Sequence, residues 1–126
     1  MKHLILPSIL LIALLVFSIF SAMFVTSTID QTEAYLVQAV FHHNLQETDK
    51  TAAFLAQTTE YWTSRQFFFG MVLKHEEVDQ VSGELERLRS YAASDDSDDF
   101  LSNCAALLAT LDHIREMEWP YLQNIL

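Results

Sequence analysis

The sequence is poor in residues that break helices. It has two glycines and two prolines in 126 residues. No segment alternates apolar and polar residues with the period of two that half-buried strands require, whereas apolar residues recur at spacings of three and four. The sequence therefore predicts an all-α fold: an N-terminal transmembrane helix followed by an antiparallel bundle of three to four helices.

Cysteine and basic residues are also scarce. Cys104 is the one cysteine, so no intramolecular disulfide can form and packing must stabilise the fold. The chain has 7 basic residues against 17 acidic ones, a formal net charge of −10 at pH 7. Because so acidic a surface repels phosphate backbones, we expect no nucleic-acid partner.

Motifs that carry known chemistry are missing as well. There is no glycine-rich phosphate loop, no Gly-x-Ser-x-Gly elbow, no His-Glu-x-x-His zinc motif and no cysteine beside a histidine. We therefore expect a protein that is not an enzyme and has no cofactor.

The N-terminus contains an apolar run, Leu4–Val25, without a charged side chain. At 1.5 Å per residue the run is about 33 Å long, enough to cross the ~30 Å hydrocarbon core of a bilayer. Lys2 precedes the run and Asp30 and Glu33 follow it, and basic flanks are retained in the cytoplasm. The pattern predicts a single-pass protein of the cell membrane with its N-terminus in the cytoplasm.

A cleaved secretory signal is the alternative for this segment, because Val25, Thr26 and Ser27 crudely resemble a cleavage site. The run is longer than the ~7 to 15 apolar residues of a typical signal, which favours an uncleaved helix. We therefore divide the chain into an anchor, residues 1–27, and an extracytoplasmic acidic helical bundle, residues 28–126.

The first external helix is expected to run to about Gln46. Asp30 with Glu33, and Thr28 with Gln31, each fit a capping box, although the helix could also continue from the membrane span. The residues on its inward stripe are Ile29, Leu36, Val40 and His43.

Two further helices follow, the first capped by Thr48 or Asp49. Their apolar stripes lie about 180° apart when projected on one continuous helix, so we place a break at Phe67–Gly70, with one long twisted helix as the alternative. The first stripe contains Phe54, Leu55, Thr58, Tyr61, Trp62, Arg65 and Phe69, and the second contains Val78, Val81, Leu85, Leu88 and Ala92.

The acidic segment Ser94–Asp99 is the clearest loop. It lacks the turn glycine and the distal glutamate of an EF-hand, so we expect it to cap the last helix rather than to bind calcium. That helix should end near Glu118, because Pro120 disfavours a helical Trp119. Its stripe makes Cys104 an unreactive core residue, together with Phe100, Leu107, Leu111 and Ile114.

Two pairs of residues could bind a metal between helices. His75 and Asp79 are four apart and His113 and Glu116 three apart, so each pair shares a helix face. Di-metal bundles use Glu-x-x-His on two helices, whereas the order here is reversed and occurs once. We favour histidines that hydrogen-bond between helices, with a metal or ligand site as the alternative.

Other histidine and aromatic residues have simpler interpretations. Because His42 and His43 are adjacent, we expect one of them, His43, to face inward as a core residue. The aromatic cluster of Tyr61, Trp62 and Phe67–Phe69 is expected to be core rather than a ligand pocket.

A combination of segments spreads over the whole chain: a tryptophan helix, a His-acid-acid-aliphatic-Asp run and a C-terminal Asn-Ile. The residues that carry it are Trp62, His75, Glu76, Asp79, His113, Glu116, Glu118, Asn124 and Ile125. They resemble the bacterial family catalogued as domain of unknown function 4363. The resemblance implies one membrane helix and a helical external domain, and implies no activity.

The leading functional hypothesis is an interaction or accessory protein. Its bundle would present the apolar tail Trp119–Leu126, or the Phe67–Phe69 region, to another membrane protein, while the anchor lies in the lipid bilayer. The alternative is an extracytoplasmic bundle that senses a metal or small ligand through the four residues His75, Asp79, His113 and Glu116.

Overall fold

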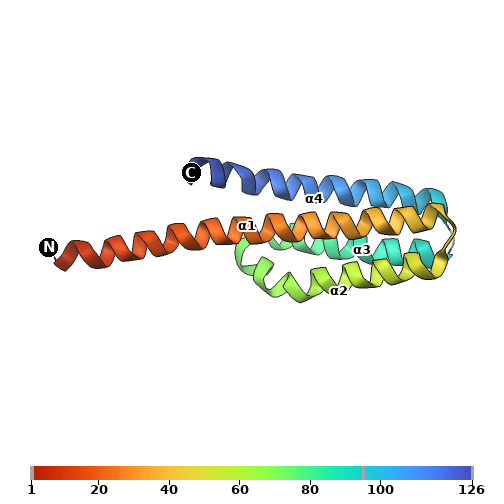
Figure 1. The fold of residues 1–126 in the computed structure, drawn as a ribbon, viewed down its shortest axis with the longest axis horizontal. Coiled ribbons are helices and arrows are strands. Elements are labelled where there is room, and N and C mark those ends of the chain that lie inside the picture. The colour runs from red at the N-terminus through yellow and green to blue at the C-terminus, as the bar shows by residue number, and fades with distance from the viewer. Residues whose placement is uncertain (1, 95, 126) are drawn as a thin grey trace.

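The computed structural model describes the backbone of residues 2–94 and 96–125 and the side chains of residues 2–94 and 96–117. These residues form four helices and no strand. The helices are α1 (Lys2–Asn44), α2 (Thr48–Val72), α3 (His75–Ser94) and α4 (Ser97–Ile125) (Figure 1). The predicted all-α fold is confirmed.

The helices form an antiparallel bundle in which each packs against the next and α4 returns to α1 (Figure 1). The N-terminal half of α1 projects from this bundle. Because α1 is continuous, the capping boxes considered at residues 28–33 are not formed. Thr28 Oγ1 instead donates to the carbonyl of Phe24 in the preceding turn, at 2.9 Å.

The core contains most residues of the stripes that the sequence predicts, but six members of those stripes are half-buried: Val40, His43, Phe54, Tyr61, Arg65 and Ala92. Each large apolar side chain in the core stabilises the fold by roughly 1.5–3 kcal/mol when it is fully buried, which compensates for the missing disulfide. Burial on α1 begins at Ser21, so the bundle includes residues from the end of the apolar run. The largest fully buried side chains include Ile29, Leu36, Leu55, Trp62, Phe69, Leu85, Leu88, Phe100, Leu107, Leu111 and Ile114.

The α1–α2 turn is tight and lacks the predicted cap. Gln46 has a φ of 60°, a left-handed conformation that few non-glycine residues adopt. The N–H groups of Gln46 and Glu47 donate to carbonyls in the last turn of α1, which satisfies its C-terminus. The predicted capping by Thr48 or Asp49 is wrong, because the N-cap residue is Glu47 and its side chain makes no cap bond.

The break between α2 and α3 is confirmed, but it falls at Leu73–Lys74, after the predicted position. Phe69 is fully buried and continues the stripe of α2, which keeps residues 67–70 helical. Leu73 is extended, with φ −115° and ψ 161°, and its N–H donates to the Phe69 carbonyl at 2.7 Å. Gly70 therefore lies inside α2 and does not form the turn.

The end of α4 differs from the prediction. The helix continues through Pro120 to Ile125, so the predicted end near Glu118 is wrong. Proline disfavours helix at the preceding residue without forbidding it, and a helix already formed loses one hydrogen bond there. At the other end, Asp96 Oδ1 accepts the Asp99 N–H at 3.3 Å, which caps α4 as expected.

Candidate functional site

The four residues of the metal hypothesis lie apart on two helices. His75 and Asp79 are exposed on α3, and His113 and Glu116 are exposed on α4. Among the described side chains, no group of three or more histidine, cysteine, aspartate or glutamate residues is close enough to hold a metal ion. The favoured interpretation, that His75 and His113 hydrogen-bond between helices, is also wrong among the described residues. Neither imidazole has such a partner, because the apolar stripes occupy the inward faces of both helices.

The remaining residues of the family combination occupy different environments. Trp62 is fully buried, whereas Glu76 is exposed. The side chains of Glu118, Asn124 and Ile125 lie outside the described residues, as does the predicted docking of the Trp119–Leu126 tail. The backbone of α4 runs back along α1 at this end (Figure 1).

His42 and His43 are both half-buried, so the expectation that just one faces inward is wrong. The His42 ring stacks on Phe54 of α2, with centroids 5.1 Å apart. The His43 ring stacks on Phe100 of α4 at 4.2 Å, and its Nε2 lies 3.0 Å from Ser97 Oγ. Because α1 lies between α2 and α4, His42 can contact α2 while the adjacent His43 contacts α4.

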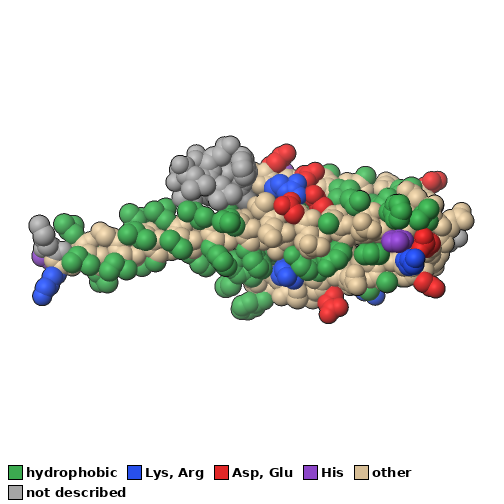
Figure 2. Space-filling view, in the orientation of Figure 1, with side chains coloured by type: hydrophobic (Ala, Val, Ile, Leu, Met, Phe, Trp, Pro, Cys, Tyr) green, Lys and Arg blue, Asp and Glu red, His purple; other side chains and the backbone are tan. Residues whose placement is uncertain are grey.

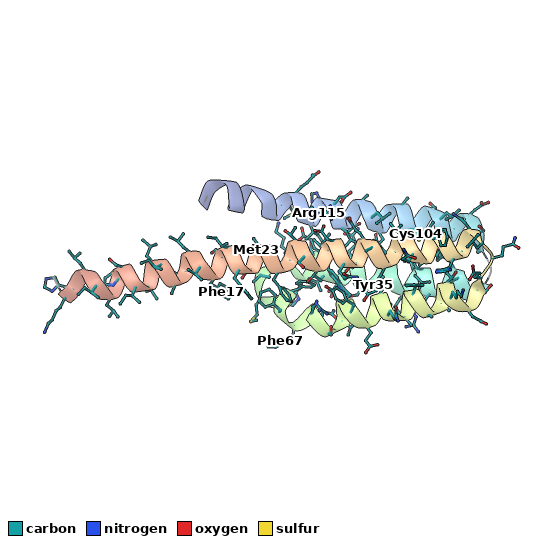
Figure 3. All side chains as sticks on the ribbon, viewed as in Figure 1. Phe17, Met23, Tyr35, Phe67, Cys104 and Arg115 are labelled. Carbon is teal, nitrogen blue, oxygen red and sulfur yellow. The ribbon has the colours of Figure 1, made fainter. Side chains whose placement is uncertain are left out.

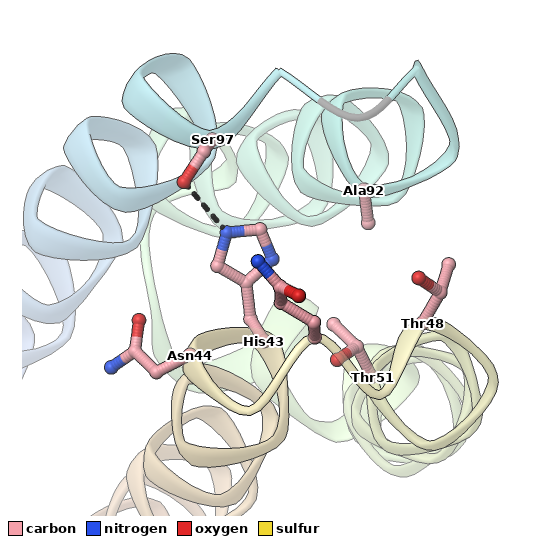
Figure 4. Close-up of a pocket in the computed structure, with 7 residues that line it drawn as sticks. His43, Asn44, Thr48, Thr51, Ala92 and Ser97 are labelled. Atoms are coloured by element: carbon pink, nitrogen blue, oxygen red, sulfur yellow. Dashed lines mark hydrogen bonds between the residues drawn. The ribbon is translucent and has the colours of Figure 1, made fainter.

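A polar hollow lies beside His43 at the end of the bundle away from the projecting half of α1. Its volume is about 410 Å³. Figure 4 shows the imidazole reaching across it to Ser97. No carboxylate lines the hollow to orient the imidazole as in a hydrolytic triad. The lining residues are His43, Asn44, Gln46, Thr48, Thr51, Ala92 and Ser97.

The aromatic cluster is divided between core and surface. Trp62 and Phe69 are fully buried with ring centroids 4.7 Å apart, which confirms the core interpretation for these two. Phe68 packs edge to face on Phe24 of α1. The core prediction is wrong for Phe67, which is 84% exposed and points away from the bundle (Figure 3).

Arg115 is the centre of an ion cluster that joins α4 to α1 (Figure 3). Its guanidinium donates to Asp30 at 2.5 Å, to Glu33 at 2.8 Å and to Asp112 at 2.6 Å. Burial, and secondarily the neighbouring Asp112, raise the pKa of Glu33 despite the pairing with Arg115. Asp30 and Glu33 lie one turn apart, but sequence alone does not place α4 in register with them.

Cys104 is buried, as predicted, at 2% exposure. Burial raises the pKa of its thiol to about 12, so the thiolate that reacts with electrophiles is nearly absent at neutral pH. Cys104 is thus a packing residue.

One helix in the described part of the chain is long and apolar enough to cross a membrane. It is α1, whose most apolar 18-residue window has a mean hydropathy of 2.7 and is 17% buried. Figure 2 shows apolar side chains along the projecting half of α1, with the acidic side chains of this face gathered over the bundle. We refer to Leu4–Phe20, which is almost entirely exposed, as the projecting segment.

These features define a class: a four-helix bundle whose first helix extends into an apolar segment long enough to span a bilayer. The chain belongs to the family described as Domain of unknown function (DUF4363), whose model matches residues 19–125. Comparison with curated proteins and with solved structures finds no match.

Proposed function

We propose that this chain is a membrane-anchored interaction protein without catalytic activity, which holds its acidic bundle at the outer face of the cell membrane and binds another membrane protein there. The continuity of α1 carries the proposal. One unbroken helix contains both the apolar run and the first helix of the bundle. A binding surface on the bundle is therefore held at a set height above the bilayer.

The packing of α1 favours an uncleaved anchor. Ala22 and Val25 are buried in the bundle, and Phe24 packs on Phe68. Cleavage after Ser27 would remove all three contacts and open the end of the core. A bundle completed by these residues is more stable when the N-terminal segment is retained.

Charge supports the outer face as the location of the bundle. Lys2 lies before the apolar run, and all 17 acidic residues lie after it. Positive flanks are retained in the cytoplasm, so the N-terminus is the end expected to stay inside.

An apolar stripe on the outer side of α1, continued by Leu45 directly after the helix ends, is the surface we assign to the partner. Val37, Phe41 and Leu45 follow each other at four-residue spacing and are 56%, 55% and 53% exposed. Along α1, Phe41 lies about 24 Å beyond Val25, too far above the apolar run to meet lipid. The partner therefore needs an extramembrane part that reaches this height.

Photocrosslinking in intact cells tests this assignment. A photoreactive residue at Phe41 should give a crosslink to another membrane protein, whereas the same residue at the exposed Gln57 of α2 should not. A chain that stays uncrosslinked at Phe41, or crosslinks equally at both positions, would contradict the proposal. A crosslink to a second copy of the chain would replace the hetero-partner with self-association.

The sensing alternative has less support, because its four residues are exposed on two helices and form no cluster. Thermal unfolding decides it. Zinc, manganese or calcium would have to raise the Tm, and His75→Ala would have to abolish that increase.

A further inference from the structure

One corner of the bundle lies beside the apolar run of α1. The corner consists of Phe67–Lys74, the last turn of α2 and the turn into α3. Within it, Phe68 packs on Phe24 of α1 with ring centroids 4.6 Å apart. Lys74 and Phe17 line a common hollow of about 280 Å³. The corner is therefore level with the end of the projecting segment.

The thickness of a bilayer brings its surface to this level. The projecting segment, Leu4–Phe20, covers about 25 Å along the helix axis, several ångströms less than the ~30 Å hydrocarbon core. The deficit is removed if the first turn inside the bundle, with the corner beside it, also enters the membrane. If the bilayer thins instead to match the shorter segment, its surface again meets the corner.

The corner has the composition of a membrane interface. Residues 61–75 contain no acidic residue, although the chain has 17 of them. Phe67 is 84% exposed and Met71, one turn later on the same face of α2, is 63% exposed. On α1, Phe20 lies one turn before Phe24, the residue that contacts the corner, and is 63% exposed.

We propose that the corner is a lipid-binding element that lies in the headgroup region of the bilayer that α1 spans. Phe67 and Met71 contact the upper acyl chains, and the exposed Lys74 reaches the lipid phosphates. Interfacial apolar side chains of this kind penetrate about 5–10 Å. The exposed Glu76, at the start of α3, limits the depth, because a carboxylate is costly to move into hydrocarbon. Glu77 is half-buried and lines the same hollow as Lys74.

Lipid fits this surface better than a protein does, because the exposed side chains of the corner are continuous with those of the projecting segment. A protein that covered Phe67 and Met71 would have to share the same narrow level with the bilayer surface. The inference requires α1 to span the membrane, and it is independent of the protein partner assigned to Val37, Phe41 and Leu45.

Fluorescence quenching tests the inference. The measurement uses nanodiscs with one full-length chain in each disc, because such nanodiscs contain no partner protein and no second copy. An environment-sensitive dye is attached to Phe67→Cys, Met71→Cys or, as a control, Gln57→Cys, which lies on α2 away from the corner. The buried Cys104 should remain unlabelled in the native protein. Each labelled chain is first shown to keep the wild-type helical content.

Phosphatidylcholine carrying a nitroxide on the upper acyl chain should quench the dye at Phe67 and Met71 about threefold more than at Gln57. The same nitroxide at the chain end should quench less. Equal quenching at all three positions would overturn the inference, and stronger quenching from the chain end would overturn the headgroup-level placement. If the quenching at Phe67 and Met71 is found but the crosslink at Phe41 is not, only the proposed partner is refuted. If the crosslink is found but the quenching is not, only the lipid contact is refuted.

Discussion

Replacing Arg115 by glutamine should loosen the contact between α4 and α1. In wild type the guanidinium donates to Asp30, Glu33 and Asp112. The amide of glutamine carries no charge and cannot reach all three partners. Arg115→Gln therefore leaves three carboxylates close together without the cation that balances them.

The exposure of each partner sets the size of the effect. Asp30 and Asp112 are 61% and 56% exposed, so each of these pairs contributes about 0–1 kcal/mol. Glu33 is 22% exposed, and a hydrogen bond between charged groups in such a setting contributes about 1.5–3 kcal/mol. Together these figures predict a loss of about 1.5–5 kcal/mol, which lowers the Tm of a domain of this size by roughly 5 °C or more.

Thermal unfolding of the full-length chain in detergent micelles, followed by far-ultraviolet circular dichroism, measures the loss. Arg89→Gln is the matched control, because Arg89 lies 4.0 Å from Glu86 and is 49% exposed, and it should change stability by less than about 0.5 kcal/mol. Adding Glu33→Gln to Arg115→Gln should restore part of the loss. Equal Tm values for the Arg115 and Arg89 variants would refute the reasoning.

Three further predictions concern single positions. The folded-state pKa of Glu33 is raised above its ordinary value of 4.5, so ionising Glu33 costs stability as the pH rises from 4.5 through the folded-state pKa. In urea titrations at several pH values, the stability of wild type relative to Glu33→Gln should therefore fall over this window. A rise would contradict the burial effect. A pKa of the Cys104 thiol near 12 instead of 9.0 predicts about 1,000-fold less thiolate at neutral pH. Cys104 should therefore react with iodoacetamide at least 100-fold more slowly in the native chain than in urea. Comparable rates would show an accessible thiol. Gly83 lies inside α3 with nothing within 4 Å of an added Cβ, so Gly83→Ala should stabilise the chain by about 0.5–1 kcal/mol in the same melts, and destabilisation would point to a contact at this position.

The sequence predicts helical content and inward faces well because each depends on periodicity within one segment. The stripe from Phe100 to Ile114 is an example, since all its members are buried. The position of the α2–α3 turn is harder to predict from the sequence, because it depends on the burial of Phe69, and that burial requires α1 to be in place. The same limit explains the error at His42, whose inward position depends on which helices flank α1.

The ion cluster shows a different limit. Its members are two short-range pairs, Asp30 with Glu33 and Asp112 with Arg115, that lie about 80 residues apart in the chain. Each pair alone resembles an ordinary solvated helix face. Their meeting depends on the register between α1 and α4, which is set by core packing and not by the charges themselves. The metal hypothesis failed to gain support for the same reason. The spacing of two residues in one helix shows that they share a face of that helix, but it does not show which face of another helix they contact.

If α1 spans a bilayer, as proposed, its unbroken course also has a mechanical consequence. A membrane helix changes its tilt when the bilayer becomes thicker or thinner, and tilts near 20° are common. Without a hinge between the apolar run and the bundle, the bundle must tilt through the same angle. From Val25 to Asn44 the helix covers about 29 Å, so a change of 20° moves the far end sideways by about 10 Å. The reach of the bundle over the membrane surface would thus vary with the thickness of the bilayer that holds it.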